Sequence, residues 1–303
     1  MGEGLDTLAY RGSILRLTNN VENLELLGPT TATLDGVGNG LDNLITGHGG
    51  ADHLDGREGR DTLEGGYGAD TLKDNIAAAF GDVPRGGFGN DTYLITTTTT
   101  VEEASGPWTG VDTVQVNGSY TLTANVENLE LLGWLSHSGR GNELGNAITG
   151  SGGANALSGL GGLDRVSGGL GNDTLDDGAG VDRLDGGAGN DSLLGGTEGD
   201  AFVFAGAWSS DTIGDWQDTA GVESSQDRLD RIDLSGLTEL SDVDTLNDLL
   251  IRQSGANVTI ALDLDGNGAA DTRDLDGNGT LDTARIVVLN ATAKNFGAAD
   301  FVF

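Results

Sequence analysis

The stretch Gly141–Val203 reads GNELGNAIT GSGGANALS GLGGLDRVS GGLGNDTLD DGAGVDRLD GGAGNDSLL GGTEGDAFV, which is seven nonapeptides without a remainder. The sixth place is always Asn or Asp, and the eighth place is always apolar. Because side chains alternate between the two faces of a strand, this pattern predicts a short strand whose eighth-place residue points inward. Glycines at places one, two and four allow tight turns between such strands. The stretch therefore predicts a solenoid in which two nonapeptides form one coil of 18 residues.

The turns offer oxygen atoms to a metal ion, because they point main-chain carbonyls inward and the sixth place adds a carboxylate. Hard oxygen ligands in a flexible cage suit calcium. Stacked coils predict two rows of sites, in which each interior Asp lies between two ions. The expected ligands are Asn146, Asp164, Asp182 and Asp200 in one row, Asn155, Asp173 and Asp191 in the other, and the carbonyls of Gly168, Gly171, Gly186 and Gly189. Asn lacks the negative charge, so the sites headed by Asn should be weaker or empty.

An earlier block of the same repeat lies at residues 38–94. Four nonapeptides fill residues 38–73, and GGFGNDTYL follows at residues 86–94. The expected ligands here are Asn43, Asp52, Asp61, Asp70 and Asp91, with the carbonyls of Gly65 and Gly68. Residues 74–85 interrupt the repeat, and we interpret them as a loop with one helical turn at Ile76–Phe80. This segment is either a recognition loop or a tolerated insertion, and the second is favoured.

The pattern G-G-x-G-x-D-x-U-x, in which U is apolar, resembles the calcium-binding repeat of RTX proteins. The resemblance covers the twelve nonapeptides of residues 38–94 and 141–203. It implies an all-β fold with two parallel β-roll solenoid blocks, several bound Ca²⁺ ions, and export from a bacterium by a type I secretion apparatus. The alternative is a flexible glycine-rich linker. Twelve repeats in phase with an apolar eighth place argue against a linker.

Composition favours a solenoid and excludes several classes of partner. The chain of 303 residues has 53 glycines, 5% aromatic residues and no cysteine, which is poor material for one large conventional core. Its net charge of −33 disfavours nucleic acid, and also anionic lipid and anionic polysaccharide unless calcium bridges them. The same charge should keep the calcium-free chain expanded. No apolar run approaches membrane-spanning length. The acidic start MGEGLDTLAY does not resemble a secretory signal peptide.

Two related β segments, residues 1–37 and 95–140, precede the two blocks and are expected to join them. VENLELLG occurs at residues 21–28 and returns letter for letter at residues 126–133. The chain is therefore an internal duplication. The region that precedes this segment in the second copy has no counterpart in the first, so we expect the chain to be a fragment of a longer protein.

The second β segment contains two further features. Thr96–Thr100 is a run of β-forming residues and is predicted to be an exposed strand. Trp108 and Trp134 flank the segment, and we expect them to plug the end of a solenoid. Stacking on sugar rings is the alternative for these two side chains.

Residues 204–303 are expected to cap the second block with β structure. Ser210–Asp218 and Asp230–Leu237 resemble the segment that follows the β-roll in serralysin-type proteases and other type I secreted proteins. The last four residues, Asp300–Phe303, resemble the uncleaved signal of type I secretion. The alternative for these residues is a final capping strand.

The same region is predicted to contain a helix, two strands and two calcium loops. Apolar residues at helical spacing indicate the helix at Val243–Arg252. Strands are expected at Val258–Leu262 and Arg285–Leu289. Between them, two loops carry acidic residues spaced as in an EF-hand but without its helices, and the alternative is a pair of solvated acidic turns. The expected ligands are Asp263, Asp265, Asn267, Asp271 and Asp274 in the first loop, and Asp274, Asp276, Asn278 and Asp282 in the second.

The sequence lacks the motifs of common catalytic sites. It has no H-E-x-x-H, no G-x-S-x-G, no Walker loop and no cysteine nucleophile. We therefore expect a calcium-binding module without catalytic activity of its own, secreted to the outside of a bacterial cell or its surface. Its expected function is to fold on Ca²⁺ outside the cell and to support type I secretion of a larger protein. The alternatives are a surface adhesin or polysaccharide-binding module, and the non-catalytic tail of a secreted enzyme.

Overall fold

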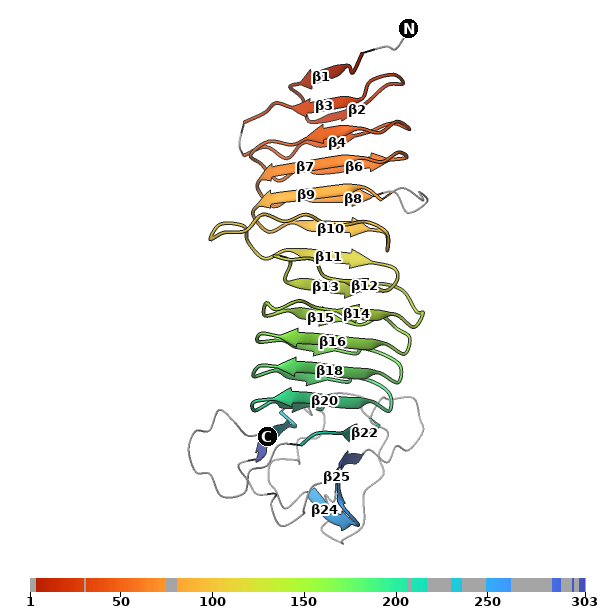
Figure 1. The fold of residues 1–303 in the computed structure, drawn as a ribbon, viewed down its shortest axis with the longest axis vertical. Helices are drawn as coiled ribbons and strands as arrows, with labels where there is room; N and C mark the ends of the chain where they lie inside the picture. The colour runs from red at the N-terminus through yellow and green to blue at the C-terminus, as the bar shows by residue number, and fades with distance from the viewer. Residues whose placement is uncertain are drawn as a thin grey trace. The chain divides into compact units, whose positions relative to one another are not determined.

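The computed structural model divides the chain into two compact units, Met1–Leu132 and Gly133–Phe303. It describes residues 4–29, 31–74, 81–205, 209–216, 230–235, 249–262, 285–289, 296 and 300–302. These residues form strands, turns and loops and contain no α-helix. Each unit is a parallel β-solenoid, so the predicted all-β fold is confirmed (Figure 1). Within this described part, no helix is long and apolar enough to cross a membrane.

In the first unit, the strands from β1 to β10 alternate between two parallel sheets, as the coils of a solenoid require. One sheet contains β1 (Thr7–Tyr10), β3 (Asn23–Leu26), β5 (Leu44–Thr46), β7 (Thr62–Tyr67) and β9 (Val83–Phe88). The other contains β2 (Ile14–Arg16), β4 (Asp35–Val37), β6 (His53–Arg57), β8 (Thr71–Asp74), β10 (Thr92–Ile95), β11 (Thr113–Val116) and β13 (Asn128–Leu131). The short strand β12 (Tyr120–Thr121) follows β11 in the chain.

The second unit repeats this arrangement, and its strands from β14 to β23 also alternate between two sheets. One sheet contains β15 (Ala147–Thr149), β17 (Arg165–Ser167), β19 (Arg183–Asp185), β21 (Ala201–Val203), β23 (Arg231–Asp233) and β27 (Phe301–Val302), all parallel. The other contains β14 (Ser138–Arg140), β16 (Ala156–Gly161), β18 (Thr174–Ala179), β20 (Ser192–Thr197), β22 (Ser210–Ile213) and β26 (Arg285–Val288), also parallel. Two antiparallel strands extend this sheet, β25 (Asn257–Leu262) and β24 (Leu249–Ser254).

The eighth-place residues form the core, as the alternation of the repeat predicts. Leu63, Tyr93 and Leu175 are fully buried, and their strand neighbours on either side are more exposed. Ile148 aligns with Val166, which lies 18 residues later, so one coil is two nonapeptides long. The first place also faces inward, because strand alternation continues from the eighth place into the next repeat. That position is small in most repeats, which leaves room beside the core for the sixth-place side chains.

The interpretation of residues 74–85 as a loop is wrong for Asp74, which is the last residue of β8, and for the last four residues. Asp82 is buried and Val83–Phe88 form β9, which pairs with β7. The spacing of Asp82 and Pro84 is that of a sixth and an eighth place, so this coil is longer by three residues rather than interrupted. Three additional residues between Asp70 and Asp82 explain why the regular nonapeptide frame is lost in the sequence. The helical turn predicted at Ile76–Phe80 lies outside the described residues.

The two predicted β joiners contain further coils of the solenoid. β1 pairs with β3 in the first copy, and β11 pairs with β13 in the second, in the same register. Asn23 Nδ2 donates to Thr7 Oγ1 at 3.1 Å, and Asn128 Nδ2 donates to Thr113 Oγ1 at 3.1 Å. These matching contacts confirm the internal duplication in three dimensions.

Two expectations for the second β segment are wrong. Thr96–Thr100 is a turn, because the hydroxyls of Thr96 and Thr99 donate to Asp74 Oδ2 and hold the chain out of the sheet. Trp108 and Trp134 are each 77% exposed, so neither side chain plugs a solenoid end.

The carboxyl-terminal region departs from prediction in one element. The expected helix at Val243–Arg252 is wrong for residues 249–252, which belong to β24; residues 243–248 lie outside the described part. β24 and β25 form a hairpin whose turn contains Gly255 at a φ of 65°, and this pairing outweighs the helical spacing of the leucines. The two predicted strands are confirmed as β25 and β26.

The end of the second unit is closed by aromatic side chains. Phe202 lies against Trp216 with ring centroids 6.2 Å apart, and Trp216 stacks on Phe296 at 5.1 Å. Phe296 in turn lies 6.2 Å from Phe301 of β27. Since Phe301 is buried and β27 pairs with β23, the last described strand continues a sheet of the second unit.

Candidate metal centre

The sixth-place side chains form hydrogen-bonded rows along each unit. Each Asp Oδ1 accepts the backbone N–H of the sixth-place residue one coil earlier. Asn146 donates to Asp164 at 2.6 Å, and Asp164 donates to Asp182 at 2.8 Å. On the other side of the roll, Asn155 donates to Asp173 and Asp173 donates to Asp191, both at 2.7 Å. The two rows predicted from coils of 18 residues are therefore confirmed as stacked rows.

The second carboxylate oxygen of most of these aspartates has no hydrogen-bond partner. Ten sixth-place aspartates of the described part share a buried, unpartnered Oδ2: Asp61, Asp70, Asp82, Asp91, Asp112, Asp164, Asp173, Asp182, Asp191 and Asp200. All ten residues are 3% exposed or less. An unpaired buried carboxylate oxygen is costly, so each of these oxygens requires a proton or a cation.

Backbone carbonyls share the space into which these oxygens point. A Cβ built on Gly168 would overlap Asp173 Oδ2 and lie 2.6 Å from the carbonyl oxygen of Gly186. A Cβ on Gly65 would likewise overlap Asp70 Oδ2 and lie 2.7 Å from the carbonyl oxygen of Gly86. The first-place glycine thus keeps open a cradle lined by one carboxylate oxygen and one carbonyl oxygen.

Of the predicted carbonyl ligands, those at the first place reach this cradle. The carbonyl of Gly65 faces Gly47 beside Asp52, and that of Gly168 faces Gly150 beside Asn155. The predicted fourth-place carbonyls face the fourth-place glycine of the next coil instead, as Gly171 faces Gly189. Gly171 and Gly189 have φ angles of 110° and 139°, which explains why glycine is needed at the fourth place.

Burial raises the pKa of the sixth-place carboxyls above their ordinary value of 3.8. The pKa rises to about 6 for Asp91, Asp164 and Asp173, to about 7 for Asp61 and Asp70, and to about 8 for Asp82, Asp112 and Asp200. Loss of hydration is the largest cause in each case, and neighbouring carboxylates raise most of these pKa values further. A hard cation with oxygen ligands would remove both costs, and flexible, irregular oxygen cages suit calcium. The residues present therefore fit Ca²⁺.

The asparagines at the sixth place are already satisfied. Asn43 Oδ1 accepts the N–H of Asn39 at 2.8 Å, and Asn155 Oδ1 accepts the N–H of Ser151 at 2.8 Å. Their Nδ2 groups donate to neighbouring oxygens, as Asn155 does to Ser151 Oγ at 2.9 Å. An amide that presents a donor inside the turn is a poor cation ligand. This geometry supports the prediction of weaker sites at Asn43, Asn146 and Asn155, which stays a prediction.

Asp52 differs from the other sixth-place aspartates because His48 occupies its second oxygen. Asp52 Oδ2 accepts the His48 N–H at 2.7 Å and lies 2.8 Å from His48 Nδ1. Burial alone lowers the pKa of His48, but the contact with Asp52 raises it above 6.5 overall. Asp52 is therefore less available to a cation than its neighbours in the row.

Four aspartates continue the rows but were not predicted from the sequence. Asp82, Asp112, Asp211 and Asp230 each accept a backbone N–H from the sixth-place residue before them, at 2.8 to 3.0 Å. All four lie in segments without a regular nonapeptide frame. Each is followed two residues later by an apolar residue or proline, and this Asp-x-apolar spacing is the signal that could have identified them.

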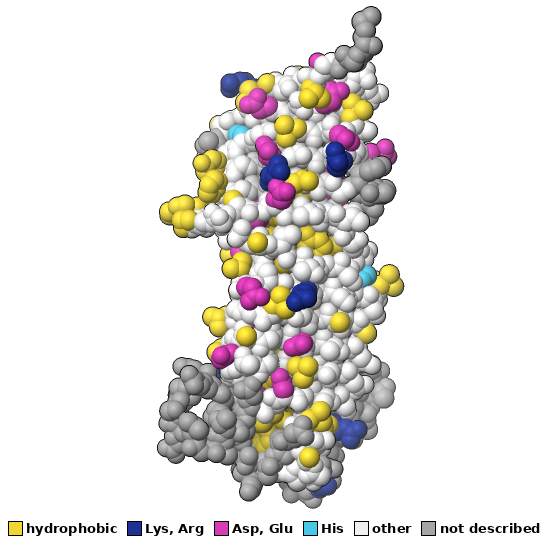
Figure 2. Space-filling view, in the orientation of Figure 1, with side chains coloured by type: hydrophobic (Ala, Val, Ile, Leu, Met, Phe, Trp, Pro, Cys, Tyr) yellow, Lys and Arg dark blue, Asp and Glu magenta, His cyan; other side chains and the backbone are white. Residues whose placement is uncertain are grey.

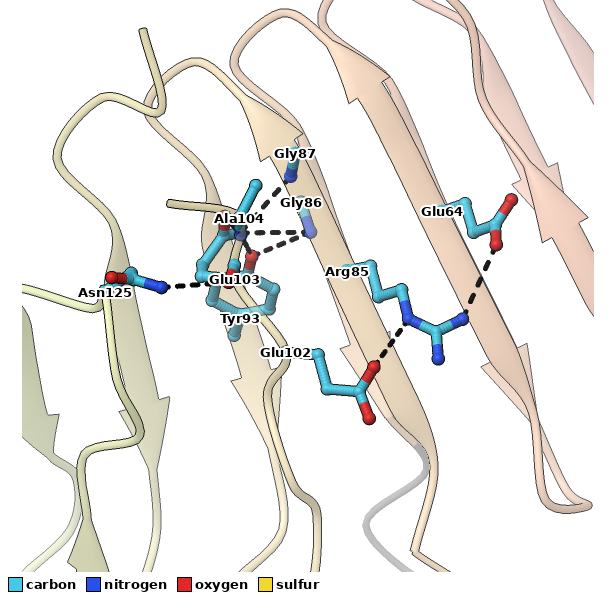
Figure 3. Close-up of polar contacts among 9 residues, drawn as sticks. All are labelled: Glu64, Arg85, Gly86, Gly87, Tyr93, Glu102, Glu103, Ala104 and Asn125. Atoms are coloured by element: carbon cyan, nitrogen blue, oxygen red, sulfur yellow. Dashed lines mark hydrogen bonds and ion pairs between the residues drawn. The ribbon is translucent and has the colours of Figure 1, made fainter. Parts of the chain in front are cut away.

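Glu103 is a further acidic residue that sequence reasoning missed. Its Oε1 accepts the N–H of Gly86 at 3.1 Å, the N–H of Gly87 at 3.3 Å and the hydroxyl of Tyr93 (Figure 3). Oxygen atoms of Asp91, Glu103 and Asp112 lie within 4.8 Å of one another. Burial raises the pKa of Glu103 to about 7. No repeat frame covers Glu103, so the sequence carries no signal for this position.

The EF-like ligand set, Asp263 to Asp282, lies outside the described residues. The strands on either side, β25 and β26, are described and pair antiparallel with each other. The two predicted calcium loops therefore connect neighbouring strands and stay predictions.

Replacement of Gly65 by alanine is expected to destabilise the calcium-loaded protein by about 1 to 3 kcal/mol. The new Cβ would overlap Asp70 Oδ2 and approach the carbonyl oxygen of Gly86, a backbone atom that cannot move freely. Thermal and denaturant unfolding in saturating calcium measure the change. Gly40→Ala is the matched control, because the nearest atom to its Cβ would be Glu58 Oε2 at 3.8 Å. Equal stability of the two variants would contradict the cradle.

Comparison with known proteins identifies the repeat. The family described as RTX calcium-binding nonapeptide repeat (4 copies) matches residues 37–72, 140–175 and 167–201. No curated protein matches the chain. Among solved structures, the extracellular lipase LipA from Serratia marcescens is similar at 14% identity and a TM-score of 0.34, over 96% of this chain and 42% of the lipase. The chain thus spans less than half the length of that lipase. It carries RTX calcium-binding nonapeptide repeats, and these repeats form a β-roll.

Proposed function

We propose that this chain is a calcium-dependent folding module that supports the secretion of a larger extracellular bacterial protein by a type I apparatus. The observation that carries the proposal is the set of stacked rows of buried Oδ2 atoms that lack a partner, of which those of Asp70 and Asp173 share a cradle with a backbone carbonyl oxygen. Such rows are unfavourable without a cation and favourable with one. The module itself is proposed to be non-catalytic.

The chain's own residues explain why folding would depend on calcium. Bound calcium supplies positive charge between coils. Each aspartate accepts a backbone N–H of the neighbouring coil with Oδ1 and leaves Oδ2 for the ion. The same side chain therefore joins the coils and binds the ion. With a net charge of −33, the calcium-free chain repels itself in any compact state. Ions that bind only the folded state add stability by mass action with each filled site.

Low calcium inside the cell would keep the chain unfolded for export, and high calcium outside would fold it. Folding on the far side would then oppose return of the chain. We place the export signal at Asp300–Phe303, whose acidic residue followed by apolar residues resembles a type I signal. The pairing of β27 with β23 is compatible with this role, because the strand would join the cap only after export.

A calcium titration followed by far-UV circular dichroism tests the proposal. The chain is first freed of calcium, and magnesium is titrated in parallel as the control. We expect a cooperative gain of β signal with calcium alone, because Mg²⁺ is smaller and demands a regular octahedral site. A chain that is already folded without calcium, or that responds equally to magnesium, would refute calcium-dependent folding.

A constitutively folded binding module, such as an adhesin or polysaccharide-binding module, is the second candidate. It is favoured by Tyr67 and Phe88, whose rings stack at 4.8 Å at the ends of the paired strands β7 and β9, with Tyr67 64% exposed. Exposed stacked rings are suited to sugar faces. Against an anionic glycan, Arg85 is occupied by Glu102 at 2.7 Å and Glu64 at 3.5 Å (Figure 3). Lys and Arg side chains also stand apart on the face drawn in Figure 2. Folding without calcium in the titration above would favour this candidate.

A further inference from the structure

Asp177 is the one residue of the second repeat block whose carboxylate lies at the first place of a nonapeptide. The first place faces inward and is glycine in the other six repeats of Gly141–Val203. Asp177 lies on β18 and is fully buried. Both of its carboxylate oxygens lack a hydrogen-bond partner.

The Asp177 carboxylate points into the cradle of the preceding coil. A Cβ built on Gly159, the first-place glycine one coil earlier, would overlap both Asp164 Oδ2 and Asp177 Oδ1. Oxygen atoms of Asp164, Asp177 and Asp182 all lie within 4.8 Å of one another. The three residues are 2%, 0% and 2% exposed. Four carboxylate oxygens of these three residues lack a partner, and one oxygen from each residue lies in the same buried space.

We propose that Asp164, Asp177 and Asp182 form a three-carboxylate calcium site that binds its ion more tightly than the other positions of the same row. The inference rests on the proposed function, since it treats the rows as calcium sites. It adds that the sites differ in calcium affinity and that Asp177 is the cause of the difference.

The chemistry of the ligands supports this inequality. Calcium affinity in oxygen cages increases with the number of charged ligands and with the rigidity of the site. The Asp164 carboxylate is fixed by the Asn146 N–H and the Asp182 carboxylate by the Asp164 N–H, each at its Oδ1, and Asp177 is fixed by β18. The comparable position in the first unit is less open to an ion, because Oε1 of Glu103 already accepts two N–H groups and the Tyr93 hydroxyl.

The alternative occupant of this space is a proton. Burial and the charges of Asp182 and Asp164 raise the pKa of Asp177 to about 9. A neutral Asp177 would satisfy part of the cluster without any ion. A measurement of calcium binding that isolates Asp177 distinguishes the two occupants.

The test compares the unaltered chain with Asp177→Gly and Asp177→Asn, by competition for CaCl₂ with a chromophoric chelator of known affinity. Asp177→Gly restores the residue that the other repeats carry, and Asp177→Asn keeps the size of the side chain. Asp176→Asn is the matched control, because it removes the same charge from an exposed position on the same strand. In both Asp177 variants, we expect one ion to leave the tightest class and to bind at least about tenfold more weakly, with the control unchanged.

Three outcomes would overturn the inference while leaving calcium-dependent folding intact. The Asp177 variants could keep the tightest ion, which would show that Asp177 is held neutral. The wild-type protein could have no separate tight class. The Asp176→Asn control could lose the ion equally, which would show that the loss of one negative charge alone explains the weaker binding. Absence of calcium binding in the wild-type protein would instead refute the proposed function itself.

Discussion

Acidification of the calcium-free chain from about pH 8 to about pH 5.5 is expected to restore much of the β-sheet signal that calcium gives at neutral pH. The buried carboxyls are the reason. The folded-state pKa is raised to about 8 for Asp82, Asp112 and Asp200, whereas an unfolded chain titrates near the ordinary value of 3.8. Between these values the folded state binds more protons than the unfolded state.

The sign of the effect follows from this difference. A group whose pKa is raised by folding contributes stability that is fully present below the unfolded-state pKa and is lost as the pH rises through the folded-state pKa. The window for these aspartates therefore runs from about pH 4 to about pH 8. At neutral pH the stabilisation is largely lost, and only a cation replaces it. At about pH 5.5 protons occupy most of the buried Oδ2 atoms, so the fold no longer needs calcium.

The measurement is far-UV circular dichroism of a chain passed over chelating resin, because soluble chelators weaken in acid. Sodium chloride added at about pH 8 is the control for simple screening. Exposed carboxylates stay ionised at about pH 5.5, so a folding transition there must come from the buried ones. A chain that stays unfolded on acidification would show that the buried carboxyls do not govern the calcium dependence.

The regular part of this structure could be predicted almost completely from the sequence. The nonapeptide at residues 168–176 places Asp173 and Leu175 two residues apart, and both are buried on the inner side of the coil as strand alternation requires. The stacking of Asp173 on Asp191 follows from the 18-residue coil alone. A repeat fixes geometry because each copy must satisfy its two neighbours in the same way.

Outside the regular nonapeptide repeat, the sequence predicted the structure less well. Asp82 and Asp112 have the same role as Asp173, but each lies 21 rather than 18 residues after its partner, which conceals the role. The leucines before Ser254 have helical spacing, yet the hairpin at Gly255 places the last of them in a strand. Asp177 was visible in the sequence as a departure from glycine, but only the packed coils bring it to Asp164 and Asp182.

Replacement of Asp191 by alanine is expected to lower the stability of the calcium-loaded protein by about 4 to 6 kcal/mol. Asp191 is an interior member of its row. Its Oδ1 accepts the Asp173 N–H at 2.7 Å, and its own N–H donates to Asp211 Oδ1 at 2.9 Å. Alanine leaves the Asp173 N–H buried without an acceptor, which costs about 1 to 3 kcal/mol in any solution. It also removes a ligand, and the loss of an ion bound at 100 times its dissociation constant removes about 2.7 kcal/mol more.

Asp191→Asn separates the two contributions. The amide oxygen can still accept the Asp173 N–H, but the carboxylate is gone. In calcium at neutral pH we expect Asp191→Asn to lose about 2 to 3 kcal/mol, close to the value of one ion. In the calcium-free protein at about pH 5.5, where no ion is bound, Asp191→Asn should be nearly neutral and Asp191→Ala should keep only the cost of the unpaired N–H.

Denaturant unfolding in the two solutions measures these changes in stability. It compares the wild type with both Asp191 variants and with Asp176→Ala. The exposed Asp176 controls for the loss of one acidic residue. If Asp191→Asn were as stable as the wild type in calcium, Oδ2 would not be a ligand, and the row would be a hydrogen-bonded ladder only. If both variants lost the same stability in both solutions, the role of Asp191 would be to hold the coils together without regard to calcium. The expected pattern, a loss for asparagine in calcium alone and for alanine in both, requires one carboxylate to join neighbouring coils with one oxygen and to bind the ion with the other.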